Sequence, residues 1–248
     1  MSCAKVALFV CLLAAGSATR AAELVLTVKP DAGRLTAFTS GGKRVRLELF
    51  LPRETGRRPA VLLLHGRGGL TRSREWLRAE GALLASNGYV GAVLHYFERT
   101  SGDPDREGTD PDRHDAWRAT VSDAVTALQR QPFVDPGSIG LVGFSLGGAL
   151  VIDVAARDAR IGAVVEFFGW LNPATPVSAL PPVLVLHGKK DDNVPVSRAA
   201  ALVRQLRRAG RPHDVHIYPG EGHGFELPAM QDALSRMLLF FAKHLARR

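Results

Sequence analysis

A serine stands in a glycine-flanked segment whose pattern is typical of a catalytic nucleophile. The segment 143–147 reads G-F-S-L-G, follows an apolar run and precedes a helix-compatible stretch. In a sharp turn from strand to helix, the serine hydroxyl stands at the end of the strand, and glycines on either side avoid crowding it. The helix that follows directs its first N–H groups toward developing negative charge. We therefore expect Ser145 to be a nucleophile and the backbone N–H of Leu146 to contribute to an oxyanion hole.

A serine hydroxyl needs a base that accepts its proton, and that base needs a third group that orients it. Both partner types follow Ser145 in the chain, each just after a predicted strand. Among the histidines beyond the acids, His223 is the one that lies between glycines on a loop. Asp191 and Asp192 compete for the role of the acid, and the spacing from Gly188 favours Asp191. The expected catalytic residues are Ser145, Asp191 and His223.

A second glycine-rich loop, residues 65–69 with the sequence H-G-R-G-G, follows the apolar run 61–64. Glycines let a chain turn so that backbone N–H groups point at one spot, which an oxyanion hole requires. The N–H of Arg67 is the expected second donor beside that of Leu146. A phosphate-binding loop is the alternative, but the Walker lysine and the dinucleotide fingerprint are both missing from this loop.

The surrounding elements predict how these loops are positioned. Continuous apolar runs are typical of strands covered on both faces. These runs are 61–64, 90–94, 139–142, 163–168 and 183–186, and a final strand is expected at 213–218. Helical stretches are expected at 73–87, 115–131, 147–157, 197–209 and 229–246, and an antiparallel start at 24–28, 35–39 and 45–51. The alternation predicts one α/β domain over residues 23–248, with a mostly parallel sheet, helices on both faces, and chemistry at the carboxyl ends of the strands.

The first residues of the chain resemble an export signal. Lys5 precedes an apolar run that ends at residue 15, and small residues follow at 16–18. This pattern predicts a signal peptide over residues 1–18, with cleavage as late as residue 22 as the alternative, and a periplasmic or secreted protein. Because Cys3 and Cys11 both lie in this segment, we expect a mature chain without a thiol nucleophile.

Four segments together resemble the dienelactone hydrolase family of α/β-hydrolases. They are residues 62–69, 143–148, 187–195 and 218–225. The resemblance implies an α/β-hydrolase fold and the hydrolysis of a carboxylic ester or lactone through an acyl-enzyme, with neither cofactor nor metal. It also makes Asp191 the acid and His223 the base. Well-studied members carry a cysteine where this chain has Ser145, and an acidic residue near Gly66 that serves the thiol; this chain lacks both, which is consistent with a serine enzyme.

The resemblance also suggests residues for substrate binding. Arg99 stands where family members use an arginine to hold a substrate carboxylate, whereas Leu227 occupies the second such position. An anionic ester or lactone is therefore one candidate for the small-molecule substrate. Phe144 beside the nucleophile and Trp170 beyond the run 163–168 are further candidates, with core packing as the alternative for Trp170. Glu166 interrupts that apolar run, which is unusual for a buried position.

Other functions remain open at this point. The same three residue types serve peptidases, thioesterases and acyltransferases, although no propeller or lid domain accompanies them, which disfavours an oligopeptidase. The formal net charge of +8 and the arginines 204, 207, 208 and 211 suggest a non-catalytic anion-binding module as a rival. No nucleic-acid motif accompanies the charge, so we expect no nucleic-acid partner and no stable membrane span. The acidic run 103–114 departs from the calcium-loop pattern because His114 occupies its twelfth position, and it predicts a solvated loop.

Overall fold

The structure is a computed structural model that describes residues 33–100 and 111–245. The expected signal peptide, the expected strand at 24–28 and most of the acidic run 103–114 lie outside these ranges. No helix in the described ranges is long and apolar enough to cross a bilayer.

Within residues 33–100 and 111–245, eight strands form one mixed sheet in the order β1-β2-β4-β3-β5-β6-β7-β8. Their bounds are β1 Arg34–Ser40, β2 Lys43–Phe50, β3 Arg58–Leu64, β4 Val90–Leu94, β5 Val134–Phe144, β6 Ile161–Phe167, β7 Val183–Gly188 and β8 His213–Tyr218. The pairs β1–β2 and β2–β4 are antiparallel, and the other neighbouring strands are parallel. The predicted antiparallel start and mostly parallel remainder are therefore confirmed.

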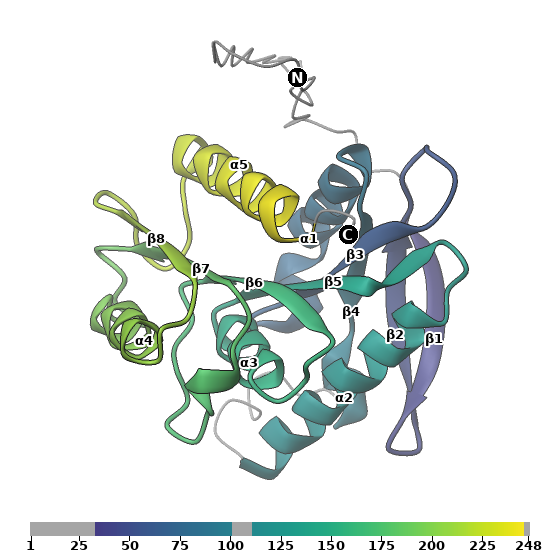
Figure 1. Cartoon of the computed structure of the whole chain (residues 1–248), viewed down its shortest axis with the longest axis horizontal. Helices are drawn as coiled ribbons and strands as arrows, with labels where there is room; N and C mark the ends of the chain where they lie inside the picture. Colours follow the sequence, from purple (N-terminus) through teal and green to yellow (C-terminus); the bar gives the residue numbers. More distant parts are fainter. Residues whose placement is uncertain (1–32, 101–110, 246–248) are drawn as a thin grey trace.

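In the described ranges, five α-helices cover the two faces of the sheet (Figure 1). They are α1 Gly69–Ser86, α2 Pro111–Gln129, α3 Leu146–Ala155, α4 Ser197–Arg208 and α5 Leu227–His244, and the short 3₁₀ helices are η1 Tyr96–Arg99 and η2 Val177–Ala179. Helices α1 and α5 pack on one face, while α2, α3 and α4 pack on the other. Successive strand residues alternate between the two faces, so Leu141 joins the core beneath α3 and Val142 joins the core beneath α1 and α5. This two-sided burial explains the continuous apolar runs in the sequence.

Several elements begin earlier than the sequence-based expectation: β3 at Arg58 rather than residue 61, α2 at Pro111 rather than residue 115, and β5 and α1 as follows. Strand β5 begins at Val134 rather than residue 139, because Val134 pairs with Arg58 before a register shift. The turn-forming residues 135–137 disguise this irregular beginning in the sequence. Helix α1 begins at Gly69 rather than residue 73, so it starts directly after the glycine-rich loop 65–68.

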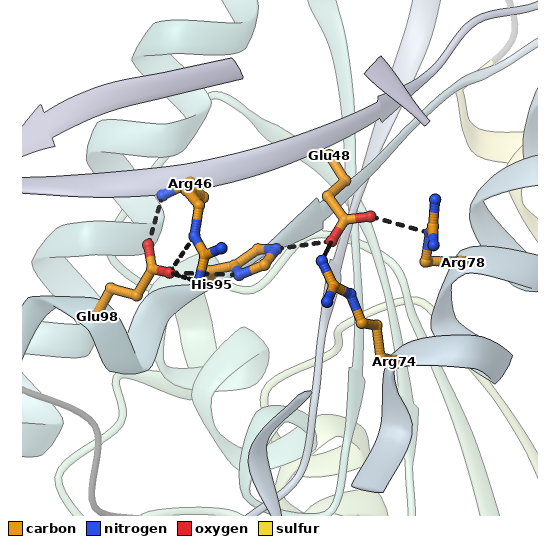
Figure 2. Close-up of polar contacts among 6 residues, drawn as sticks. All are labelled: Arg46, Glu48, Arg74, Arg78, His95 and Glu98. Atoms are coloured by element: carbon orange, nitrogen blue, oxygen red, sulfur yellow. Dashed lines mark hydrogen bonds and ion pairs between the residues drawn. The ribbon is translucent and has the colours of Figure 1, made fainter. Parts of the chain in front are cut away.

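A cluster of charged side chains around the buried carboxylate of Glu48 fastens α1 to strand β2 (Figure 2). The carboxylate of Glu48 on β2 lies 3.2 Å from Arg74 and 3.0 Å from Arg78, both on α1. It also lies 2.9 Å from Nε2 of His95, which follows β4. Because α1 starts just after the loop 65–68, this cluster fixes the position of the helix that follows the loop.

Candidate active site

Ser145 occupies a strained turn between the end of β5 and the start of α3. Its backbone has φ 55° and ψ −115°, in a region that non-glycine residues rarely adopt. A Cβ on Gly143 would lie 2.1 Å from the carbonyl oxygen of Gly147, and one on Gly147 would lie 2.5 Å from that of His65. Both glycines of the G-x-S-x-G segment are therefore required by close backbone packing, which leaves Ser145 at the carboxyl end of the sheet.

The structure brings the three expected polar side chains into one hydrogen-bonded chain. Nε2 of His223 lies 2.9 Å from Oγ of Ser145, and Nδ1 of His223 lies 2.8 Å from Oδ2 of Asp191. With the proton on Nδ1, the imidazole donates to the carboxylate and leaves Nε2 free to accept from the hydroxyl. Asp192 is exposed, whereas Asp191 is buried. Of the two aspartates, Asp191 is thus the partner of His223.

The loop after β7 holds Asp191 by its other oxygen. Oδ1 of Asp191 accepts backbone N–H groups from Asn193 at 2.9 Å and Val194 at 2.8 Å. Nε2–H of the buried His187 donates to the carbonyl of Val194 at 2.8 Å, and burial lowers the pKa of His187. A neutral, buried histidine therefore holds the end of this loop through the Val194 carbonyl. The carboxylate of Asp191 keeps a fixed direction toward His223.

The glycine-rich loop 65–69 runs beside the nucleophile. A Cβ on Gly66 would lie 3.2 Å from Cβ of Ser145, and the Gly69 N–H donates to the Gly66 carbonyl at 3.0 Å. This turn contains Arg67, and Leu146 begins α3, whose first N–H groups lack acceptors within the helix. The two expected oxyanion donors thus belong to backbone segments on either side of Ser145.

Packing around His65 fixes the start of this loop. The hydroxyl of Tyr96 donates to the His65 carbonyl at 2.8 Å, and the two rings stack with centroids 4.2 Å apart. Burial lowers the pKa of His65 to about 4, so its ring stays neutral at pH 7. His65 is therefore a packing residue of the loop.

The expected substrate-binding residues lie in three different settings. Phe144 is 2% exposed, stacks on Phe167 at 4.5 Å and meets Trp76 edge-on at 4.4 Å. The guanidinium of Arg99 lies against Gly41 in the β1–β2 turn, where a Cβ would come within 1.8 Å of it. Trp170 is partly buried against the core shared by α2, α3 and α4. Their roles toward a substrate stay predictions.

Sequence reasoning did not anticipate the conformation of Phe168. With φ 42°, Phe168 is, besides Ser145, the one non-glycine residue of the described ranges with a positive φ. Its ring lies 4.9 Å from the imidazole of His223 and 5.4 Å from Phe225. A left-handed dihedral at an aromatic residue depends on tertiary packing, which the sequence does not reveal. The one local sign of a turn at this point is the glycine that follows Phe168.

Comparison with known proteins relates this site to a family. NocK of Nocardia uniformis subsp. tsuyamanensis is 30% identical over 187 residues, which cover 71% of this chain and half of that protein. A Bradyrhizobium protein named "Probable 2-oxo-3-(5-oxofuran-2-ylidene)propanoate lactonase" is 25% identical over 84% of this chain and 92% of its own. The dienelactone hydrolase-like promiscuous phosphotriesterase P91 from metagenomic libraries shares the fold, with a TM-score of 0.75 at 23% identity over 87% of this chain and all of that one. The sequence profile of the dienelactone hydrolase family matches residues 45–245, and this chain therefore belongs to the dienelactone hydrolase family.

Proposed function

We propose that this protein cleaves carboxylic ester or lactone bonds through an acyl-enzyme on Ser145. The observation that carries the proposal is the hydrogen-bonded chain from Asp191 through His223 to Ser145. These residues follow strands β7, β8 and β5, where an α/β sheet collects its functional loops. Membership of a hydrolase family supports the same reaction class.

The geometry suits acyl transfer in two steps. Nε2 of His223 accepts the hydroxyl proton as Oγ of Ser145 attacks the substrate carbonyl carbon, and the N–H groups of Leu146 and Arg67 stabilise the oxyanion. The imidazolium then gives its proton to the leaving oxygen, and the C–O bond of the ester breaks. Water repeats the sequence on the acyl-enzyme, which releases the acid and restores Ser145. Throughout, Asp191 orients the imidazole and offsets its positive charge.

The placement of Arg99 bears on the charge of the substrate. Its guanidinium packs against Gly41 in the β1–β2 turn, so its placement gives no positive support for a bound substrate carboxylate. We therefore place uncharged esters and lactones first among the substrates, with anionic lactones as the comparison. Thioesters, peptides and acyl transfer to an alcohol complete the panel, because the same three catalytic residues would serve each.

The proposal is tested by steady-state hydrolysis of a short-chain nitrophenyl ester and of a matched lactone. Ser145→Ala should lower the rate by roughly 10³-fold or more, because the residual rate then depends on binding and oxyanion contacts alone. Ser235→Ala is the matched control, since the Ser235 hydroxyl bonds to the Gln231 carbonyl one turn earlier in α5. Wild-type turnover by Ser145→Ala would overturn the proposal.

We also propose that the chain is exported. Support comes from Lys5, the apolar run that follows it and the small residues at 16–18. Expression of the full chain in a bacterial host, followed by fractionation and N-terminal sequencing, tests this. A periplasmic or secreted product that starts between residues 19 and 23 supports export, and a cytoplasmic product that retains residues 1–18 contradicts it.

A further inference from the structure

Glu166 is a buried carboxyl group that the proposed reaction does not use. It lies in β6 between Gly143 of β5 and Val185 of β7, and its exposed fraction is 0%. Burial raises its pKa to about 8, opposed in part by a hydrogen bond from Gly169. The group is therefore neutral at pH 7. Burying a polar group is unfavourable unless it is hydrogen-bonded, so the contacts of this carboxyl group should explain its place in an apolar sheet.

In the described part of the chain, the Glu166 carboxyl group accepts one hydrogen bond, and its donor lies in the turn beyond β6. Oε2 accepts the backbone N–H of Gly169 at 2.7 Å, while Oε1 has no partner in the described part of the chain. Gly169 in turn passes against the first turn of α3, where a Cβ would lie 2.7 Å from Gly148 and 2.8 Å from Ala149. Glu166 thus fixes the point at which the chain crosses the helix that begins after Ser145.

The same turn touches both the nucleophile and the base. The carbonyl of Phe167 accepts the N–H of Ser145 at 2.9 Å. The next residue, Phe168, has its left-handed backbone held by an N–H bond to the Leu186 carbonyl at 2.8 Å, and its ring faces His223. The two strained non-glycine residues of the described ranges, Ser145 and Phe168, therefore lie at the ends of neighbouring strands and are joined by the hydrogen bond from Ser145 to Phe167.

We propose that Glu166 is a positioning residue of the active site, whose hydrogen bond to Gly169 holds Phe168 against His223 and the Phe167 carbonyl against Ser145. The inference rests on the proposed function. A left-handed aromatic residue tends to relax to a negative φ, and the Gly169 N–H would lose its buried acceptor without Glu166. Relaxation of the turn would displace the base and the nucleophile together, without removing either.

Three variants separate this role from a general contribution to packing. Glu166→Gln keeps a neutral acceptor of the same shape, and its kcat should stay within about threefold of wild type. Glu166→Leu removes the acceptor, and its kcat should fall by about tenfold or more while KM changes by less than about threefold. Val164→Ala, on the same strand and the same face, removes buried volume without touching the turn and should leave kcat unchanged. If leucine does not fit, Glu166→Met supplies the same loss.

A double substitution tests the route through Phe168. Phe168→Gly gives the turn a residue that adopts positive φ without strain and removes the ring from His223. In that background, Glu166→Leu should lower kcat by less than about threefold, because the strained backbone no longer needs to be held. Multiplicative losses in the double variant would overturn the proposed coupling between the two residues.

Amide hydrogen exchange decides the structural half of the proposal independently of turnover. The amide of Gly169 should exchange faster in Glu166→Leu than in wild type, and at the wild-type rate in Glu166→Gln. Equal exchange in wild type and Glu166→Leu would overturn the proposal, whatever happens to kcat. If the wild-type enzyme neither hydrolyses esters nor reacts with a fluorophosphonate, the proposed function fails instead, and the catalytic role of Glu166 fails with it.

Discussion

Two histidines of this protein bind a buried carboxylate at nearly the same distance, and they differ in what faces the other ring nitrogen. His223 lies 2.8 Å from Asp191, and His95 lies 2.9 Å from Glu48. The far nitrogen of His223 meets the hydroxyl of Ser145 at 2.9 Å. The far nitrogen of His95 lies 3.5 Å from the carboxylate of Glu98 (Figure 2). A hydroxyl can give a proton to a histidine and receive it back, whereas an ionised carboxylate has no proton to give.

The surroundings of the two carboxylates reinforce this difference. The carboxylate of Asp191 also accepts two backbone N–H groups, which fix its direction but add no counter-charge. Glu48 is completed by the guanidinium groups of Arg74 and Arg78, which neutralise it. The side chain of His223 is 21% exposed, and that of His95 is 5% exposed. A histidine–carboxylate pair therefore forms a proton relay in one place and a structural cluster in the other, according to what lies beyond the pair.

Among changes to the two histidine–carboxylate pairs, removing the charge of Asp191 should have the largest effect on the reaction. Asp191→Asn keeps the shape but favours the wrong histidine tautomer, so kcat should fall by about 10³- to 10⁴-fold. Hydrolysis of the nitrophenyl ester measures this. Asp192→Asn is the matched control, since Asp192 is exposed and should leave kcat within about twofold. Equal losses in the two variants would contradict the assignment of the acid.

Removing the carboxylate of Glu48 should lower the stability of the protein more than its activity, which is the opposite of the effect expected for Asp191→Asn. Glu48→Ala leaves the buried ring of His95 without its hydrogen-bond partner and the partly exposed Arg74 and Arg78 without their counter-charge, and unfolding should become easier by about 3 kcal/mol. Denaturant unfolding at pH 7 measures the loss. The kcat of the remaining folded enzyme should change far less than in Asp191→Asn. A loss of kcat as large as in Asp191→Asn would contradict the distinction between the two histidine–carboxylate pairs.

The stability of the protein should depend on Glu166 in a pH window set by its raised pKa. Between its ordinary pKa of 4.5 and its folded pKa of about 8, the unfolded chain releases this proton while the folded chain retains it. Stability is therefore lost as the pH rises through this window. Glu166→Gln, which cannot ionise, should match wild type near pH 4 and be more stable by about 3 kcal/mol at pH 7. Urea unfolding at both pH values checks this, and a constant difference would contradict a neutral Glu166.

The ion pair between Arg46 and Glu98, which adjoins the Glu48 cluster at His95, should contribute least to the stability of the protein. Arg46 bonds to Glu98 with a side chain that is largely open to solvent. Arg46→Ala should lower the free energy of unfolding by less than about 1 kcal/mol, and most of that small loss should vanish in high salt. Thermal unfolding at low and high ionic strength measures it. A loss comparable to that of Glu48→Ala would mean that the cluster acts as one unit out to its exposed edge.

Much of the fold and of the candidate site could be predicted because it depends on local sequence. Continuous apolar runs predicted the parallel strands, and glycine spacing identified the loops that carry Ser145 and His223. The sequence did not predict the start of β5, which depends on pairing with Arg58. Nor did it predict the partners of Glu48 and Glu166. Which polar groups meet a buried carboxylate is decided by residues distant in the chain, and the left-handed turn at Phe168 exists only because neighbouring elements hold it.

The central claim is that Ser145 is the group activated by His223 and Asp191. The most direct measurement is reaction of the native protein with a fluorophosphonate, followed by mass-spectrometric mapping of the modified peptide. We predict one stoichiometric adduct on Ser145, which is absent in Ser145→Ala and strongly slowed in His223→Ala. An adduct on another residue, or native protein that remains unmodified, would contradict it.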